Sequence, residues 1–408
     1  MVVTPALDAP PSPRVIPSSV LLRKGAALAF AAAALLPAAA SADGDRLRAR
    51  AAYVPNDSGV AAAAANAGWA AVQWELNGPF GINAPQAWSQ ASRLGGSGGR
   101  GVTVAVLDSG IAYARRGRYR ASPDLARSRF VRGYDFVDND PYPSDEYGHG
   151  TFVASTIAAT ANNAYGTVGV AYRARLMPIR VLDSEGRGYP STIARAIRYA
   201  VRRGADVINL SLELYDGPPL APTPRSVTAS RSVRSALADA RRAGVVVVSA
   251  AGNSSDPNVP AKKYDTLAIN VGGTTERGCL GDYSNHGPGL DLVAPGGGAD
   301  ADVTGDPNCH PAAPAGRDIS AVSFRTESPG RFEVLPRFRG TSTASPHVSG
   351  VVALVLASRL LGRNPAPSAV ERHLESTARD LGAPGRDRFY GAGLVDAARA
   401  TAPLTSSG

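Results

Sequence analysis

Short β-branched runs alternate with helical patterns from residue 102 onward, and this alternation restricts the folds that the chain can adopt. Strand-like runs such as "VTVAVLD" (102–108) and "VVVVSAAGN" (245–253) are separated by helix-like segments such as "IARAIRYAVRRG" (193–204). A strand that is apolar at every position, such as "VVVV" at 245–248, needs burial on both faces. The sequence therefore predicts an α/β fold whose mainly parallel sheet is covered by helices on both sides.

The composition is typical of a globular protein, because 44% of the 408 residues are hydrophobic and 19% are charged. The net charge of +9 would suit a nucleic-acid partner if the basic residues were clustered. The arginines are instead scattered along the chain, without a basic helix or an aromatic-basic repeat. We interpret the basic residues as part of a solvated surface and expect no nucleic-acid partner.

The N-terminal region has the pattern of a signal peptide. Two cations at 23–24 precede an apolar run over 25–36 and then the small residues "ASA" (40–42), although the stretch before the cations is long for such a leader. The apolar run is too short to cross a bilayer, which takes about 20 residues. We expect residues 1–42 to be a signal peptide region without a stable membrane anchor, and the mature chain to be secreted or periplasmic.

Cys279 and Cys309 are the only cysteines, and their spacing matches no metal-binding pattern. In an oxidising compartment the simplest interpretation is a disulfide that closes the glycine- and proline-rich loop between them. Such a bond would stabilise the fold by about 3 to 4 kcal/mol. Two unpaired thiols remain the alternative.

Two polar residues stand where an α/β fold places functional groups. Asp108 ends a strand that we expect to be buried, so its carboxylate is either a hydrogen-bonded structural acceptor or a functional group. His149 lies between two glycines ahead of an apolar helix, in "YGHGTFVAS". The tight turn that the glycines permit favours an exposed proton carrier over a core residue.

Asn253 and Ser342 complete this set of polar residues. Asn253 ends another strand, where it is either a turn residue or an amide donor for an oxyanion. Ser342 begins a strongly apolar helix, where a capping role alone would contribute about 1 kcal/mol.

Together these four residues have the chemistry that acyl transfer needs. Ser342 would attack, His149 would take its proton, and Asp108 would orient the imidazole. Asn253 and the Ser342 backbone N–H would hold the oxyanion.

The motifs "AVLDSGI", "GHGTFVA", "AAGN" and "GTSTASPHVSG" resemble those of the subtilisin-like (subtilase) serine proteases, and the chain order Asp, His, Ser is similar. The resemblance covers roughly residues 73–400. It implies a three-layer α/β/α fold with a mainly parallel central sheet, and a serine endopeptidase that needs no cofactor for its chemistry. Two positions depart from the family, with Phe152 in place of a second histidine and Thr343 in place of a methionine.

Two other functions are weighed against this one. A catalytically impaired binding protein on the same fold is disfavoured because all four residues are present. A serine esterase of the α/β-hydrolase fold would need Gly-x-Ser-x-Gly and a serine that precedes the aspartate and the histidine, whereas Ala344 replaces the second glycine and the order is reversed here.

The resemblance also implies where substrate binds. "NLSLE" (209–213) resembles the edge segment on which subtilases pair with the substrate backbone. Glu213 stands where the family usually has glycine, so it either acidifies the specificity pocket and favours basic P1 residues or turns to solvent. The expected substrate-binding residues are Ser211, Leu212, Glu213, Ala250, Ala251 and Gly252.

A structural calcium ion is a further implication of the resemblance. "SPDL" and "ANNAYG" resemble the segments of a calcium site, in which Asp124 and Asn163 would offer hard oxygen ligands.

The domain organisation that follows has four parts. Residues 43–72 form a short leader or linker and no full pro-domain, 73–400 form the catalytic domain, and 401–408 form a tail, all preceded by the signal peptide region. We expect a monomer that acts on protein or peptide substrates.

Overall fold

The computed structural model describes residues 55–58, 68–125, 129–212, 214–215, 227–228, 231–258 and 267–404. The expected signal peptide region, Glu213 and the last residues of the tail lie outside this part of the chain.

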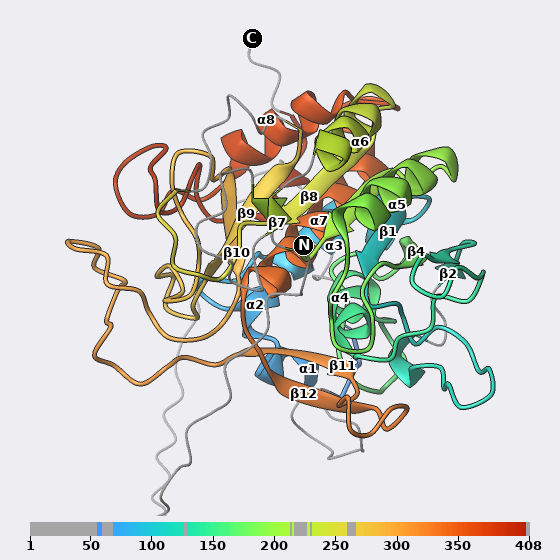
Figure 1. The fold of residues 1–408 in the computed structure, drawn as a ribbon. Coiled ribbons are helices and arrows are strands. Elements are labelled where there is room, and N and C mark those ends of the chain that lie inside the picture. Colours follow the sequence, from blue (N-terminus) through green and yellow to red (C-terminus); the bar gives the residue numbers. More distant parts are fainter. Residues whose placement is uncertain are drawn as a thin grey trace, which may run out of the picture. The chain divides into compact units, whose positions relative to one another are not determined.

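A parallel sheet forms the centre of the described structure (Figure 1). Its strands are β1 (Thr103–Asp108), β2 (Arg129–Phe130), β3 (Tyr134–Asp135), β4 (Arg175–Arg180), β5 (Val207–Leu210), β8 (Val246–Ala250), β9 (Ile269–Thr274) and β10 (Leu292–Pro295). They lie in the order β10-β9-β8-β5-β1-β4-β2, and β3 also pairs with β4. The chain passes from β1 to β4 on one side and returns to β5 on the other, so the order reverses at β1. Ligand sites of open α/β sheets lie at the carboxyl end of such a reversal.

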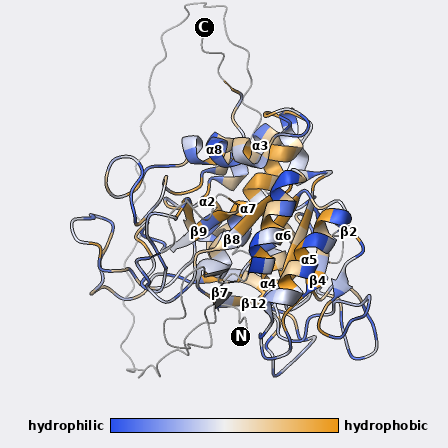
Figure 2. Ribbon diagram, turned by 45° about the horizontal axis from the view of Figure 1, so that its top comes forward, coloured by the Kyte–Doolittle hydropathy of each residue, from blue (hydrophilic) through white to orange (hydrophobic). Residues whose placement is uncertain are grey.

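Alternate residues of each strand enter two different cores, because successive side chains of a strand point to opposite faces. On β1, Val104 and Val106 belong to the core that contains α3 (Ala84–Arg93), α4 (His149–Ala158) and α7 (Thr341–Ser358). Ala105 and Leu107 belong to the core under α5 (Pro190–Arg202) and α6 (Arg231–Arg242). Figure 2 shows hydrophobic strands and α7 between helices with hydrophilic outer faces. The three-layer α/β/α prediction is confirmed.

The central helix α7 is buried along nearly all of its length. A helix that is apolar all round fits only inside a large fold, and this one packs between the sheet and its neighbours α3 and α4. Among the described residues, no helix combines the length and apolarity that crossing a bilayer requires.

Shorter elements surround these layers. An antiparallel hairpin of β11 (Ile319–Ser323) and β12 (Glu333–Phe338) lies next to α4. The remaining elements are α1 (Gly68–Val72), α2 (Trp74–Asn77), η1 (Ser97–Gly99), η2 (Pro123–Leu125), β6 (Leu214–Tyr215), β7 (Val227–Thr228), α8 (Pro367–Thr377) and α9 (Ala397–Ala400).

Part of the stretch that the sequence assigned to a leader packs on this fold. Trp69 in α1 is 3% exposed and makes an edge-to-face contact with Trp88 at 5.7 Å between ring centroids. The Trp69 indole N–H also donates to the Pro55 carbonyl at 3.1 Å.

Candidate active site

Asp108 and His149 are in direct contact at the carboxyl edge of the sheet. Asp108 is the fully buried last residue of β1, and His149 is the first residue of α4. His149 Nδ1 lies 2.8 Å from Asp108 Oδ1 and 3.0 Å from Oδ2. Because a carboxylate only accepts hydrogen bonds, Nδ1 carries the proton and Nε2 is the nitrogen left to act as a base.

The glycines on either side of His149 are required by the geometry. Gly148 has a φ of 95°, and a Cβ there would lie 2.5 Å from the Phe324 carbonyl oxygen. A Cβ on Gly150 would collide with the carbonyl oxygen of Gly110. The close approach of the β1 end, the hairpin and the start of α4 therefore depends on these two positions having no side chain.

Asp145 connects the Asp108 segment to the turn that carries His149. Its Oδ1 accepts from the Ser109 hydroxyl at 2.8 Å and from the N–H groups of Tyr147 and Gly148, both at 2.9 Å. Its Oδ2 accepts from the N–H and the hydroxyl of Thr151, at 2.8 and 2.5 Å. Burial raises the pKa of this carboxyl, and these hydrogen bonds oppose the shift. The sequence reasoning missed Asp145, although an acid four residues before a glycine-flanked histidine is a signal that could have identified it.

Asn253 and Ser342 meet around Gly340. The Asn253 side-chain oxygen accepts from the Thr341 N–H at 2.8 Å and from the Thr341 hydroxyl at 2.9 Å. A Cβ on Gly340, whose φ is 134°, would lie 3.1 Å from Asn253 Nδ2 and 3.4 Å from Ser342 Oγ. The amide nitrogen and the serine hydroxyl therefore flank one small space at the positive end of α7.

A proline and a serine shape the first turn of α7. Pro346 has no N–H, so the Ser342 carbonyl lacks the donor that a regular helix would supply four residues later. The buried Ser211 hydroxyl donates to that carbonyl at 3.0 Å and also lies 3.0 Å from Ser345 Oγ. Asn209 continues this network, since its amide donates to Ser211 Oγ at 2.9 Å and it accepts from Ser349 Oγ at 2.8 Å. The end of β5 thus anchors the helix turn that carries Ser342.

These two pairs of residues share one edge of the molecule. Asp108 and Asn253 lie at and just beyond the carboxyl ends of the parallel strands β1 and β8, with β5 between them. His149 and Ser342 begin the adjacent helices α4 and α7, which pack in the same core.

The residues expected to bind substrate lie along the same edge. Leu212 is fully buried, Ala250 ends β8, and Ala251 is partly exposed beyond it. Gly252 has a φ of 106°, and its N–H donates to the Thr341 hydroxyl at 3.1 Å. The Ser211 side chain faces α7, so any contact of Ser211 with substrate would use its backbone.

Comparison with known proteins agrees with this arrangement. The model of the subtilase family matches residues 99–393. Subtilisin BL from Lederbergia lenta is 37% identical over 327 residues, which cover 79% of this chain and 98% of that protein. Thermitase from Thermoactinomyces vulgaris is 33% identical over 325 residues, which cover 79% of this chain and 94% of that protein.

The chain belongs to the subtilase family. It is a serine-type endopeptidase. A solved structure of a protease from Pseudoalteromonas arctica PAMC 21717 superposes with a TM-score of 0.65 at 30% identity, covering 86% of this chain and 99% of that one.

The two departures from the family motifs have packing partners in this subtilase. The Phe152 ring stacks on Phe338 of β12, with 3.8 Å between ring centroids. The Thr343 hydroxyl donates to the carbonyl oxygen of Gly340 at 2.7 Å. His347, farther along α7, is buried, and the Thr343 carbonyl lies 2.8 Å from its Nδ1. Burial lowers the pKa of His347 to about 4, so this imidazole is neutral at pH 7.

The cysteine prediction is confirmed, since Cys279 and Cys309 form a disulfide with 4.9 Å between their Cα atoms.

Two carboxylates gather at the loop that the sequence assigned to calcium. Asp124 Oδ1 accepts from the Asn163 amide at 2.9 Å, and Oδ2 accepts from the Thr167 N–H at 2.9 Å. Asp57 accepts from the N–H groups of Asn162 and Asn163 at 2.9 and 3.2 Å. Burial, with a smaller contribution from the charge of Asp57, raises the pKa of Asp124 to about 7. Within the described part of the chain neither carboxylate pairs with a lysine or arginine, so a hard cation suits this donor set.

Sequence reasoning missed Asp57, which lies more than 100 residues from the loop it contacts. The turn-forming "PND" at 55–57 was the available signal.

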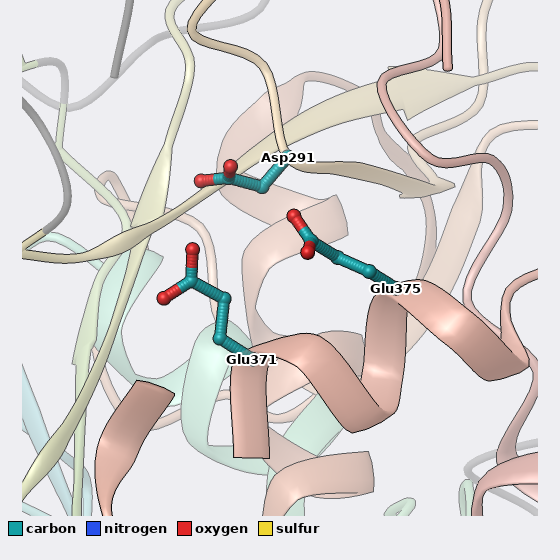
Figure 3. Close-up of side chains that lie close together, drawn as sticks. All are labelled: Asp291, Glu371 and Glu375. Carbon is teal, nitrogen blue, oxygen red and sulfur yellow. The ribbon is translucent and has the colours of Figure 1, made fainter. Parts of the chain in front are cut away.

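A second acidic cluster is formed by two residues of α8 and the residue directly before β10 (Figure 3). Glu371 and Glu375 on α8 approach Asp291, with carboxylate oxygens within 4.8 Å of one another. Arg386 pairs with Asp291 at 3.1 Å and with Glu375 at 2.8 Å, and Arg241 lies 3.5 Å from Glu371. We interpret this cluster as an ion-pair network that ties α8 to the sheet.

Proposed function

We propose that this subtilase hydrolyses peptide bonds with Ser342 as nucleophile, His149 as general base and acid, and Asp108 as the group that orients the imidazole. Asn253 Nδ2 and the Ser342 backbone N–H form the oxyanion hole. The observation that carries the proposal is the contact between buried Asp108 and His149 Nδ1 at 2.8 Å, at the edge where α7 presents Ser342.

Acylation begins when Ser342 Oγ attacks the carbonyl carbon of the scissile bond and His149 Nε2 takes the hydroxyl proton. The carbonyl oxygen becomes an oxyanion between Asn253 Nδ2 and the Ser342 N–H. When the C–N bond breaks, the imidazolium gives its proton to the departing amine and an acyl-enzyme remains. Water then attacks the ester with His149 as base, and the acid product leaves with Ser342 restored.

The role of Thr341 follows from this chemistry. Thr341 holds the Asn253 side-chain oxygen with two hydrogen bonds. Asn253 Nδ2 is therefore directed toward the oxyanion before substrate arrives. Such preorganised donors lower the barrier by about 2.7 to 4 kcal/mol each.

The first experiment is labelling of the purified chain with a fluorophosphonate probe, with casein hydrolysis followed in the same tubes. We expect both signals in wild type and neither in Ser342→Ala. Ser358→Ala is the matched control, because Ser358 lies at the other end of the same helix and its hydroxyl donates to the Val355 carbonyl at 2.7 Å. Labelling that persists in Ser342→Ala would refute the assignment of the nucleophile. Absence of labelling in folded wild type would favour the impaired binding protein, an alternative that the comparisons do not support.

We also propose that Asp57, Asp124 and Asn163 hold a structural calcium ion in this enzyme. The Asn163 amide would have to rotate to present its oxygen, because its nitrogen now donates to Asp124. The ion would supply charge neutralisation to two buried carboxylates and take no part in the chemistry. On the pattern of residues 1–42, we propose that the enzyme acts outside the cytoplasm. We also propose that it acts on protein or peptide substrates as a monomer.

A further inference from the structure

A pocket of about 560 Å³ lies against the turn that precedes His149, and the proposed mechanism does not use it. Its base is formed by residues 144–146, the first part of that turn. One wall is the loop over residues 111–120, and the other is the turn over residues 324–330 that joins β11 to β12.

Both walls are hydrogen-bonded to the His149 turn itself. From the first wall, Arg118 and the Tyr119 hydroxyl donate to the Glu146 carboxylate. From the second wall, the Thr326 hydroxyl donates to the Tyr147 carbonyl at 2.9 Å. Directly before that wall, Ser323 of β11 donates to the Gly148 carbonyl at 2.6 Å. A ligand in the pocket therefore lies against the segment that presents the catalytic base.

The pocket combines an apolar part with polar and charged lining residues, as a site for a polar peptide side chain requires. Ile111, Ala112 and Phe324 line it and are almost fully buried in the protein. The volume falls within the range of about 300 to 1,000 Å³ that small ligands occupy, and it exceeds that of one amino-acid side chain.

The acidic groups that line the pocket are already engaged. The Asp145 carboxylate is buried and accepts hydrogen bonds from the Ser109 and Thr151 hydroxyls. Glu146 pairs with Arg118 and, at 2.8 Å, with Arg180, a buried arginine at the end of β4.

Arg120 is the lining cation without such a partner. Its Nη1 donates to the carbonyl oxygens of Gly117 at 2.9 Å and Tyr119 at 3.2 Å, and among the described residues it pairs with no carboxylate. Its aliphatic stem lies against Gly330, where a Cβ would be 2.9 Å from Arg120 Cγ. The contact between the two walls thus positions an exposed guanidinium at the pocket with its charge uncompensated.

We propose that this pocket is a specificity subsite that accepts an acidic side chain of the polypeptide substrate, with Arg120 as the residue that pairs with its carboxylate. The inference rests on the proposed function, because the pocket acts on specificity only if His149 belongs to the catalytic site. Its ligand is an aspartate or glutamate close to the scissile bond.

The test uses a neutral peptide with a single cleavage site and variants that carry Glu, Gln or Lys at each of the three positions on either side of the scissile bond. For wild type we expect kcat/KM to be higher for Glu than for Gln at one position, by about two- to fivefold, as for an exposed ion pair. Arg120→Gln should remove this preference, and Arg120→Glu should transfer it to Lys. Each variant is judged by its own ratio of kcat/KM for the Glu and Gln peptides, so a general change in activity does not affect the comparison.

Arg325→Gln is the matched control, because Arg325 lies in the opposite wall and already pairs with Glu333 at 2.8 Å. The preference should persist in this variant and weaken as salt rises toward 0.5 M. Equal cleavage of Glu and Gln peptides by wild type at every position would overturn the proposal. A Glu preference that survives in Arg120→Gln would overturn it as well.

Failure of the proposed function is distinguishable from failure of the subsite. If wild type cleaves none of the peptides, including the neutral one, the assignment of the catalytic site is wrong. The subsite is then tested by fluorescence anisotropy with the Glu and Gln peptides, and equal binding by wild type and Arg120→Gln would overturn it.

Discussion

Two glycines beside the proposed catalytic groups leave no room for a side chain. Gly150 has no room for a Cβ against the Gly110 carbonyl, and Gly340 combines a φ of 134° with close contacts to Asn253 and Ser342. Pro346 removes a helix donor that Ser211 replaces. At this scale the site depends on backbone approach and on replaced hydrogen bonds as much as on the reactive side chains.

The site also depends on the hydrogen bonds that the Asp145 carboxylate accepts. We expect Asp145→Asn to lower kcat by about 10- to 100-fold with little change in KM, because an amide cannot accept from Ser109, the turn N–H groups and Thr151 together. A shift in the alkaline or acid limb of the pH–rate profile should accompany the loss, since His149 would no longer be held against Asp108. The measurement is steady-state kinetics on a peptide substrate over pH 5 to 10.

Asp206→Asn is the matched control for this prediction. Asp206 is an exposed residue whose carboxylate accepts from the Thr103 N–H at 2.8 Å, at the opposite end of β1. It should lower stability without changing kcat per folded molecule. Equal losses of kcat in the two variants would assign Asp145 a purely structural role.

At the scale of the elements, the site depends on helix α4 and the β11–β12 hairpin, which pack against each other. Ser155 of α4 donates to the Val322 carbonyl of β11 at 2.8 Å, and the Phe152 ring stacks on Phe338 of β12. The hairpin therefore covers the helix that begins with His149 and also forms a wall of the Arg120 pocket. The Phe152 departure from the family motif is explained by this packing.

The short helix α2 carries a buried acid that makes stability depend on pH. Glu75 is 1% exposed, its Oε2 has no hydrogen-bond partner among the described residues, and burial raises its pKa to about 8. Below pH 4.5 both the folded and unfolded states hold the proton, so the free energy of unfolding is unaffected. Between about pH 4.5 and 8 only the unfolded state loses it, so stability falls as pH rises and then levels off.

Glu75→Gln should remove this dependence. Both proteins carry Ser342→Ala, which prevents self-digestion, and their free energies of unfolding are measured in urea. The difference between variant and parent should rise in favour of the variant by at least about 2 kcal/mol as the pH rises from 4.5 to 9. Parallel stability curves for the two proteins would contradict the assignment of the buried proton.

At the scale of the whole described structure, the segment before the sheet joins distant parts of the fold. Asn56 and Asp57 contact the loop at 162–164, Trp69 enters the core, and Gln73 exchanges hydrogen bonds with Val168 at 2.8 and 3.0 Å. From the same loop, the Asn163 amide donates to Asp124 of η2 at 2.9 Å. Three segments thus meet at the proposed calcium site.

Calcium should accordingly stabilise the whole domain. In the Ser342→Ala background, calcium at about 100 times its Kd should raise Tm by about 5 °C over the protein in EDTA, which corresponds to about 2.7 kcal/mol. Asp57→Asn should reduce this shift, whereas Asp306→Asn, a substitution remote from the loop, should not. Identical melting curves in calcium and EDTA would refute the site.

The sequence by itself determined the parallel α/β architecture and the candidate positions of Asp108, His149, Asn253 and Ser342. These features are encoded locally, because apolar periodicity defines strands and helices, and the ends of parallel strands lie at one edge. The glycines around His149 and before Ser342 are likewise recognisable from the neighbouring sequence, because they permit the tight turns there.

Only the tertiary structure decided which distant side chains meet. Asp145 contacts Ser109, Asp57 contacts the loop at Asn163, and Ser211 supplies the donor that Pro346 lacks. The pocket beside Arg120 likewise exists because the loop over residues 111–120 packs against the hairpin turn over residues 324–330. No local pattern encodes such contacts, since each depends on how separate elements pack and on which side-chain orientations the packed interior permits.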